Sequence, residues 1–257
     1  MLTDLTEIFA SVFTRNGLIT AFIFVGLILA ASNWLSKTLT KGQIHGSAIA
    51  ITIGLILAYI GGTMTQGSNG IADITIFSGV AVLGGAMFRD FAIVATAFGA
   101  DLKTLKDAGW MAGASVIIGV VLSFVVGVLV AYVAGYTDPV ALTTIGAGAA
   151  TYIVGPVTGT ALGADSDVVA LSVAAGLTKS ILVMIATPLV AGRIGLNNPH
   201  SALIYGGLMG TTSGVAAGLA ATDPKLVPYG AMTATFYTGV GCLLAPSVLY
   251  FLVYQLI

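Results

Sequence analysis

Six stretches of this chain are long and apolar enough to cross a lipid bilayer as helices, and together they contain only two charged side chains, Asp73 and Lys179. A helix rises about 1.5 Å per residue, so roughly 20 residues span the hydrocarbon core. The ten-residue alternation typical of an outer-membrane barrel is absent from the sequence. We therefore expect an all-α integral membrane protein with about six transmembrane helices. They are predicted at Gly17–Ser36, Gly46–Gly62, Ile71–Phe88, Ala108–Gly135, Val168–Ala191 and Val227–Tyr254.

Composition excludes several other classes of protein. Charged residues make up 7% of the 257 residues, against roughly 25% in soluble domains. The net charge of −1 argues against nucleic acid as a partner, because binding phosphates requires a basic face. Cys242 is the only cysteine, so an intrachain disulfide is excluded.

Two further segments, Val140–Gly163 and Ser201–Ala221, are long enough to cross but are rich in Gly, Ser and Thr. The pair Gly155-Pro156 in the first and the run Gly210–Gly214 in the second predict breaks in the helix, because proline removes a backbone donor and glycine favours irregular chain. Broken helices at membrane depth are tolerated where they are buried in protein or line a wet cavity. In the other interpretation, small residues simply allow helices to pack closely in lipid.

Basic residues indicate the orientation. Lys37 and Lys41 follow the first span and Lys103 and Lys106 the third, while the alternate loops lack Lys and Arg, so the positive-inside rule puts the N-terminus outside. If both doubtful segments are re-entrant, Arg193 is cytoplasmic and the two hairpins enter from opposite sides. If both cross fully, Arg193 lies outside. We expect one polytopic domain, with residues 1–135 as scaffold and 136–257 holding the hairpins and the substrate-binding core.

Each break predicts a half-helix N-terminus, whose free amides and positive dipole suit an anion. Thr158 and Ser213 are placed to cap such ends. Discontinuous helices that meet near the midplane are typical of binding sites in secondary transporters. The predicted substrate-binding residues are Thr151, Tyr152, Gly155, Thr158, Gly159, Thr160, Gly210, Thr211, Thr212, Ser213 and Gly214, together with Lys179.

Lys179 lies near the middle of a predicted span, too deep to reach the interface easily. A charge at the bilayer centre costs at least about 2.5 kcal/mol on insertion scales, so it needs a partner or a function. One hypothesis is an ion pair with a carboxylate such as Asp73 or Asp90. The other is a cation that faces a water-filled cavity and binds a carboxylate substrate.

Asp165 and Asp167 flank a predicted helix start. Acidic residues there complement the helix dipole, but they are also candidate ligands for a coupling Na⁺ ion. The sequence leaves Na⁺ and H⁺ coupling open. It contains no GxSxG, HExxH or Walker motif, so we expect neither an enzyme nor a cofactor.

The runs GAATYIVGPVTGTALGADSDVVALSVAAGLTKSILVMIATP and GGLMGTTSGVAAGLAATDPKLVPYGAMTATFYTGVGCLLAP resemble the MadM subunit of malonate transporters, and the likeness extends over essentially the whole chain. It implies a symporter that imports the malonate dianion with Na⁺ or H⁺ across a bacterial inner membrane. It also implies a smaller membrane subunit, MadL, as partner, and two re-entrant hairpins that move against a scaffold. The oligomeric state is left open.

A looser likeness extends to the LrgB/CidB membrane proteins. It rests on Thr158–Thr160 and on Gly210–Thr212. The alternative that it implies is a holin-type or regulatory membrane protein without coupled uptake.

Overall fold

The computed structural model describes residues 10–42, 44–67, 70–83 and 102–257, and its regular elements in these ranges are all helical. The chain divides into two compact units, Met1–Val94 and Ala95–Ile257. Helix α6 belongs to the second unit, while the predicted division at residue 135 into scaffold and binding core stays a prediction.

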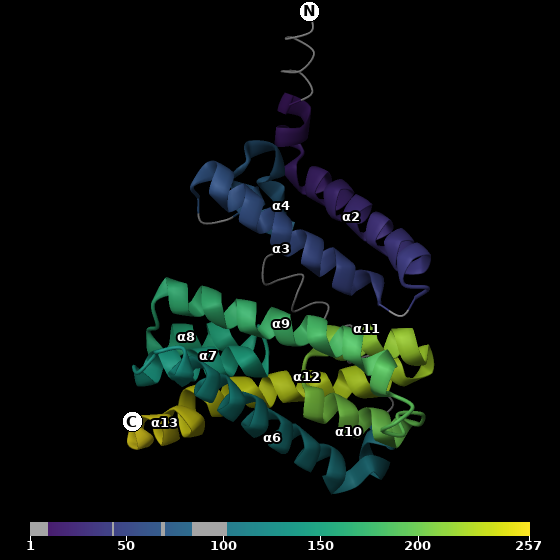
Figure 1. The fold of residues 1–257 in the computed structure, drawn as a ribbon, viewed down its shortest axis with the longest axis vertical. Coiled ribbons are helices and arrows are strands. Elements are labelled where there is room, and N and C mark those ends of the chain that lie inside the picture. Colours follow the sequence, from purple (N-terminus) through teal and green to yellow (C-terminus); the bar gives the residue numbers. More distant parts are fainter. Residues whose placement is uncertain (1–9, 43, 68–69, 84–101) are drawn as a thin grey trace, which may run out of the picture. The chain divides into compact units, whose positions relative to one another are not determined.

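In the first unit, α2 (Gly17–Leu39) and α3 (Gly46–Thr65) lie side by side (Figure 1). The chain then continues as the short helices η1 (Gly70–Asp73), η2 (Thr75–Phe77) and α4 (Gly79–Leu83). These replace the beginning of the continuous helix predicted over Ile71–Phe88, and residues 84–88 lie outside the described part. Of these, η1 packs onto α3, where Gly61 has no side chain to exclude Ile71: a Cβ there would lie 2.6 Å from the Ile71 Cα.

Three long helical segments form the frame of the second unit, close to where the sequence predicts them. Helix α6 (Leu102–Val133) bends at Gly109, whose φ of 58° is a left-handed conformation suited to glycine. The others are α9 (Ser166–Val190) and α12 (Val227–Leu244), which runs through a π-helical turn at Ala245–Leu249 into α13 (Tyr250–Leu256).

Within the described residues, five helical segments are long and apolar enough to cross a membrane. The predicted span without a counterpart among these five is the one that begins at Ile71, part of which lies outside the described residues. The five are Gly17–Leu39, Gly46–Thr65, Gly109–Val133, Ser166–Val190 and Pro224–Leu256.

Short helices fill the two segments rich in Gly and Thr. They are α7 (Pro139–Ala150), α8 (Val154–Leu162), α10 (Pro199–Met209) and α11 (Thr212–Thr222). Helices α7 and α10 begin at conventional caps, because Asp138 and Asn198 accept backbone N–H bonds and a proline follows each of them.

Helices α7 and α8 form an antiparallel hairpin. A Cβ on Gly155 would lie 2.8 Å from the Cα of Gly148, and one on Gly159 would lie 2.9 Å from Thr144 Cγ2. Later residues of α8 therefore lie beside earlier residues of α7, so the two helices run in opposite directions. Figure 1 shows both helices beside the beginning of α9.

Helices α10 and α11 also double back, with their bend beside the middle of α9. Thr211 at the bend bonds to Ser180, and both arms then reach Thr187, two turns further along α9. From α10, Tyr205 Oη lies 2.7 Å from Thr187 Oγ1, while a Cβ on Gly218 of α11 would lie 2.6 Å from the Thr187 Cβ. The two hairpins thus extend in opposite directions from the middle of α9.

The first break differs in position from the predicted one, while the second falls within the predicted run Gly210–Gly214. The first lies at Thr151–Ile153, and Gly155-Pro156 falls in the first turn of α8, where a proline needs no N–H partner. The second lies at Gly210–Thr211, before Thr212 and Ser213 enter α11. Thr158 and Ser213 are consequently inside helices, and Thr151 and Thr211 supply the capping oxygens instead.

Candidate functional site

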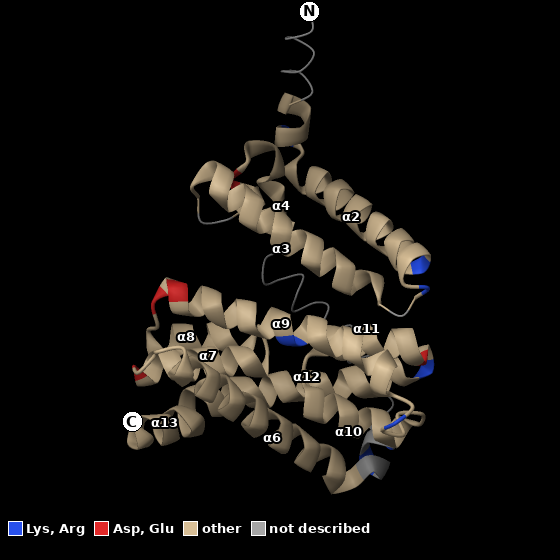
Figure 2. Ribbon diagram, in the orientation of Figure 1, with Lys and Arg blue, Asp and Glu red and all other residues tan. Residues whose placement is uncertain are grey.

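The ammonium of Lys179 lies where the bends of both hairpins meet the middle of α9. Its Nζ donates hydrogen bonds to Ser123 Oγ at 2.8 Å, to the Ala150 carbonyl at 2.9 Å and to Tyr237 Oη at 3.2 Å. It also lies 5.0 Å from the centroid of the Tyr237 ring. Figure 2 shows this single basic position in the middle of α9, with the other charges of the unit at the ends of helices.

The first hairpin reaches Lys179 because glycines let its bend approach α9. A side chain on Gly176 would overlap the Tyr152 backbone, so Tyr152 lies against α9 one turn before Lys179. Ala150 is the last residue of α7, and its carbonyl is one of the last four in the helix, which have no backbone N–H partner within the helix. The ammonium therefore binds the negative end of the α7 dipole.

Tyr237 connects the second hairpin to the same point. Its side chain is fully buried, and its Oη donates to the Gly119 carbonyl of α6 at 3.0 Å. Its ring fills the space beside Gly210, where any Cβ would overlap it, and Gly210 has φ of 73°. One tyrosine thus contacts α6, Lys179 and the bend between α10 and α11.

Both bends present a capped helix N-terminus. Thr151 Oγ1 accepts the backbone N–H bonds of Ile153 and Val154, each at 3.2 Å. Thr211 Oγ1 accepts that of Gly214 at 3.4 Å and pairs with the Ser180 hydroxyl. The N-termini of α8 and α11 therefore lie at the two bends, next to Gly176 and Ser180 of α9, and the positive end of a helix dipole suits an anion.

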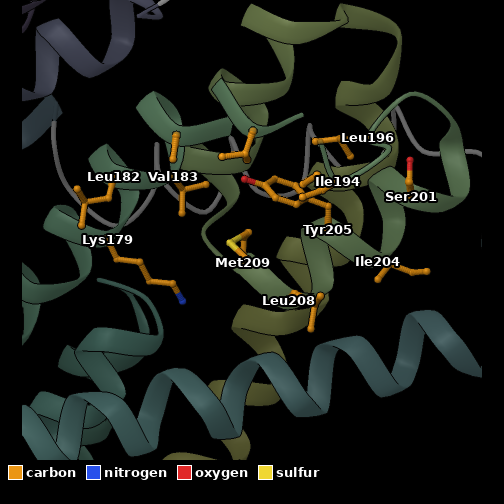
Figure 3. Close-up of a pocket in the computed structure, with 12 residues that line it drawn as sticks. Lys179, Leu182, Val183, Ile194, Leu196, Ser201, Ile204, Tyr205, Leu208 and Met209 are labelled. Carbon is orange, nitrogen blue, oxygen red and sulfur yellow. The ribbon is translucent and has the colours of Figure 1, made fainter. Parts of the chain in front are cut away.

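Two cavities adjoin Lys179. One of about 740 Å³ lies between α9 and α10, and Figure 3 shows Lys179 at one end of it and Ser201 at the other. A second, of about 500 Å³, lies against α6 and includes Ser123 and Met209. Their linings are mainly apolar, and Lys179 is the one charged group among the described residues that line them.

Several buried hydroxyls of the hairpins have no hydrogen-bond partner among the described residues. Buried polar groups are normally paired, so each has bonding capacity left for a ligand, an ion or water. They are Thr143, Thr144 and Thr158 in the first hairpin and Thr212 and Ser213 in the second.

Comparison with known proteins identifies the family. A family model described as "Malonate/sodium symporter MadM subunit" matches residues 9–257, nearly the whole chain. The chain belongs to the MadM family. This MadM-family chain is therefore a multi-pass membrane protein and a subunit of a transporter rather than an enzyme, and the family implies malonate transport and a partner subunit. No curated protein and no solved structure matches it.

The structure of this MadM-family chain brings part of the predicted site together. Thr151, Tyr152 and Gly155 lie at the first bend or in the turn that follows it, and Gly210–Gly214 cover the second bend and the first turn of α11, both beside α9 near Lys179 or Ser180. Thr158 and Gly159 are buried further along α8, whereas Thr160 is exposed.

Asp165 and Asp167 do not join this cluster. Both are exposed at the beginning of α9, and Asp165 is about 20 Å from Lys179 along the helix. No group of three His, Cys, Asp or Glu side chains that could hold a metal occurs in the described part of the chain. Their role as Na⁺ ligands stays an untested prediction.

The partners that the structure gives Lys179 are neutral oxygens, and the hypothesis of an ion pair with Asp73 or Asp90 is not tested by them. Asp73 belongs to the first unit, and Asp90 lies outside the described residues. Ser123 and Tyr237 are site residues that were not predicted from the sequence. Their one signal is a hydroxyl in the interior of an otherwise apolar span, a common feature of packed helices.

Proposed function

We propose that the chain imports malonate by symport with Na⁺, together with a smaller membrane subunit of the MadL type, across a bacterial inner membrane. The observation that carries this proposal is the position of Lys179: a lone ammonium near the middle of a span, at the junction of two helix bends. An intramembrane charge held among neutral oxygens is typical of a substrate pathway.

The proposed malonate site has a cation and two helix N-termini. One carboxylate is bound by Lys179, and the other by the first turns of α8 and α11. The free hydroxyls of Thr212 and Ser213 at the start of α11 add hydrogen-bond donors. Two separated negative charges suit this arrangement better than one.

In this proposal both hairpins are re-entrant and enter the membrane from opposite sides. The first begins and ends beside Asp138 and Asp165, at the outer surface. The second begins and ends beside Arg193 and Lys225, which the positive-inside rule places in the cytoplasm. Each bend then marks the depth to which one aqueous side reaches, as alternating access requires.

Uptake of labelled malonate into proteoliposomes tests the proposal. The protein with its partner subunit is expected to accumulate malonate when a Na⁺ gradient is imposed, and a proton gradient alone should not drive uptake. Saturable uptake that follows only the proton gradient would contradict Na⁺ coupling. A leak that does not saturate would favour a holin-type function.

A further inference from the structure

The oxygen atoms around the Lys179 ammonium resemble the ligands of a monovalent metal cation. One is a side-chain hydroxyl, one a phenolic hydroxyl and one a backbone carbonyl, at 2.8, 3.2 and 2.9 Å from Nζ. The carbonyl ends a half-helix, and the C-terminal ends of broken helices coordinate Na⁺ in transporters. All three ligands are uncharged groups whose oxygen atoms carry partial negative charge. When a cation leaves this position, the pocket that remains is therefore partly negative.

From this geometry we infer that Ser123, Ala150 and Tyr237 form the Na⁺ site, and that Lys179 occupies it as a tethered ammonium until malonate draws the ammonium away. The inference rests on the proposed malonate/Na⁺ symport and deepens it. It assigns the ligands of the coupling ion to the bend of the first hairpin and to α6 and α12.

The lysine side chain has room for this exchange. Cavities of about 740 and 500 Å³ both include Lys179, and its four-carbon stem has several rotatable bonds. A small rotation of the stem moves the ammonium away from Ala150 and Ser123 and into a cavity, where a carboxylate meets it.

Coupling follows from competition between two cations for one position. Without malonate, the ammonium fills the site and excludes Na⁺, so Na⁺ does not cross alone. When malonate binds the ammonium, the site becomes free for the ion. The ammonium and one Na⁺ together neutralise the dianion, which lowers the cost of carrying the loaded site through a low-dielectric layer.

Binding of radioactive Na⁺ to the purified protein with its partner subunit tests this directly. For the wild type, saturating malonate should raise the Na⁺ affinity at least about tenfold. Lys179→Met, which keeps an apolar stem but lacks the terminal ammonium, should bind Na⁺ without malonate, and malonate should no longer raise the affinity. Thr178→Val is the control, because Thr178 is exposed and bonds only within α9.

A folded Lys179→Met protein that does not bind Na⁺ without malonate would overturn the inference. A second pair of variants covers the case in which Lys179→Met fails to fold. Ser123→Ala removes one proposed ligand, while Ser115→Ala removes a hydroxyl of the same helix that bonds to the Ala112 carbonyl. Ser123→Ala should raise the Na⁺ concentration for half-maximal uptake about tenfold, with the malonate KM at saturating Na⁺ unchanged.

The uptake assay distinguishes a failure of the proposed function from a failure of the inferred Na⁺ site. If the wild type takes up malonate without any need for Na⁺, the proposed function fails. If uptake needs Na⁺ but Ser123→Ala behaves like Ser115→Ala, the proposed function stands and the inferred Na⁺ site is wrong.

Discussion

Tyr237 contacts three parts of the candidate site. It accepts a bond from Lys179, donates one to Gly119 of α6 and packs against Gly210 at the second bend. The two parts of the side chain therefore have separate roles. The hydroxyl bonds to the Lys179 ammonium and to the backbone of α6, and the ring packs against the bend between α10 and α11.

Tyr237→Phe keeps the ring and removes the hydroxyl. Because a buried carbonyl and an ammonium each lose a partner, we expect the free energy of unfolding to fall by about 1–3 kcal/mol. Denaturation of the purified protein in detergent measures it. Tyr254→Phe, at an exposed position on α13, is the control and should change little. Equal stability of the two variants would show that the Tyr237 hydroxyl bonds are not formed.

Two structural constraints favour glycine at position 210: its backbone conformation and the nearby Tyr237 ring. The φ of 73° at Gly210 disfavours any side chain, and a Cβ would overlap the Tyr237 ring. Gly210→Ala should therefore cost about 2–5 kcal/mol of stability and abolish uptake.

Two further glycines separate these causes. Gly163→Ala meets the same φ of 73° with open space around it, and should cost only about 1–2 kcal/mol. Gly192→Ala meets neither constraint and should be neutral. Similar losses for Gly210→Ala and Gly163→Ala would mean that the ring does not pack against the bend.

At the scale of elements, the sequence predicts the long helices well and the bends only approximately. Apolar length predicts α9 to within two residues at either end. The breaks depend on which threonine caps the following helix, and Thr151, Thr158, Thr211 and Thr212 are equally suitable from composition. Glycine contacts with α9 decide among them, and those contacts are long-range.

The caps themselves provide a test of the bends. Thr151→Val and Thr211→Val keep the shape of the side chain but lose the oxygen that accepts the first amides of α8 and α11. We expect each to lower stability by about 1 kcal/mol and to weaken malonate binding. Thr151→Ser and Thr211→Ser keep the oxygen and should retain most of both. A calorimetric titration with malonate that finds valine and serine variants equal would contradict the proposed role of these helix ends.

For the whole molecule, the apolar runs predict the membrane class and the likeness to MadM predicts the family, which the family model confirms. The path of the hairpins across the membrane could not be predicted from the sequence, because both segments are long enough to cross. The structure shows each of them doubling back beside α9, and the proposed membrane placement follows from that geometry.

Labelling of introduced cysteines tests this placement. With Cys242 replaced by alanine, Thr137→Cys and Asp165→Cys flank the first hairpin, and Asn197→Cys and Lys225→Cys flank the second. All four positions are exposed. A membrane-impermeant thiol reagent should reach the first pair from outside and the second pair only from the cytoplasmic side. Members of one pair that react from opposite sides would indicate a hairpin segment that crosses fully.

The most direct test of the proposed malonate site is Na⁺-driven uptake of labelled malonate by Lys179→Met, beside Thr178→Val, with both proteins reconstituted in equal amount together with the partner subunit. We predict that Thr178→Val accumulates malonate like the wild type and that Lys179→Met accumulates none, because it cannot bind the dianion. Normal accumulation by Lys179→Met would contradict this prediction, since malonate would then cross without the ammonium that the structure places at the junction of the two hairpins.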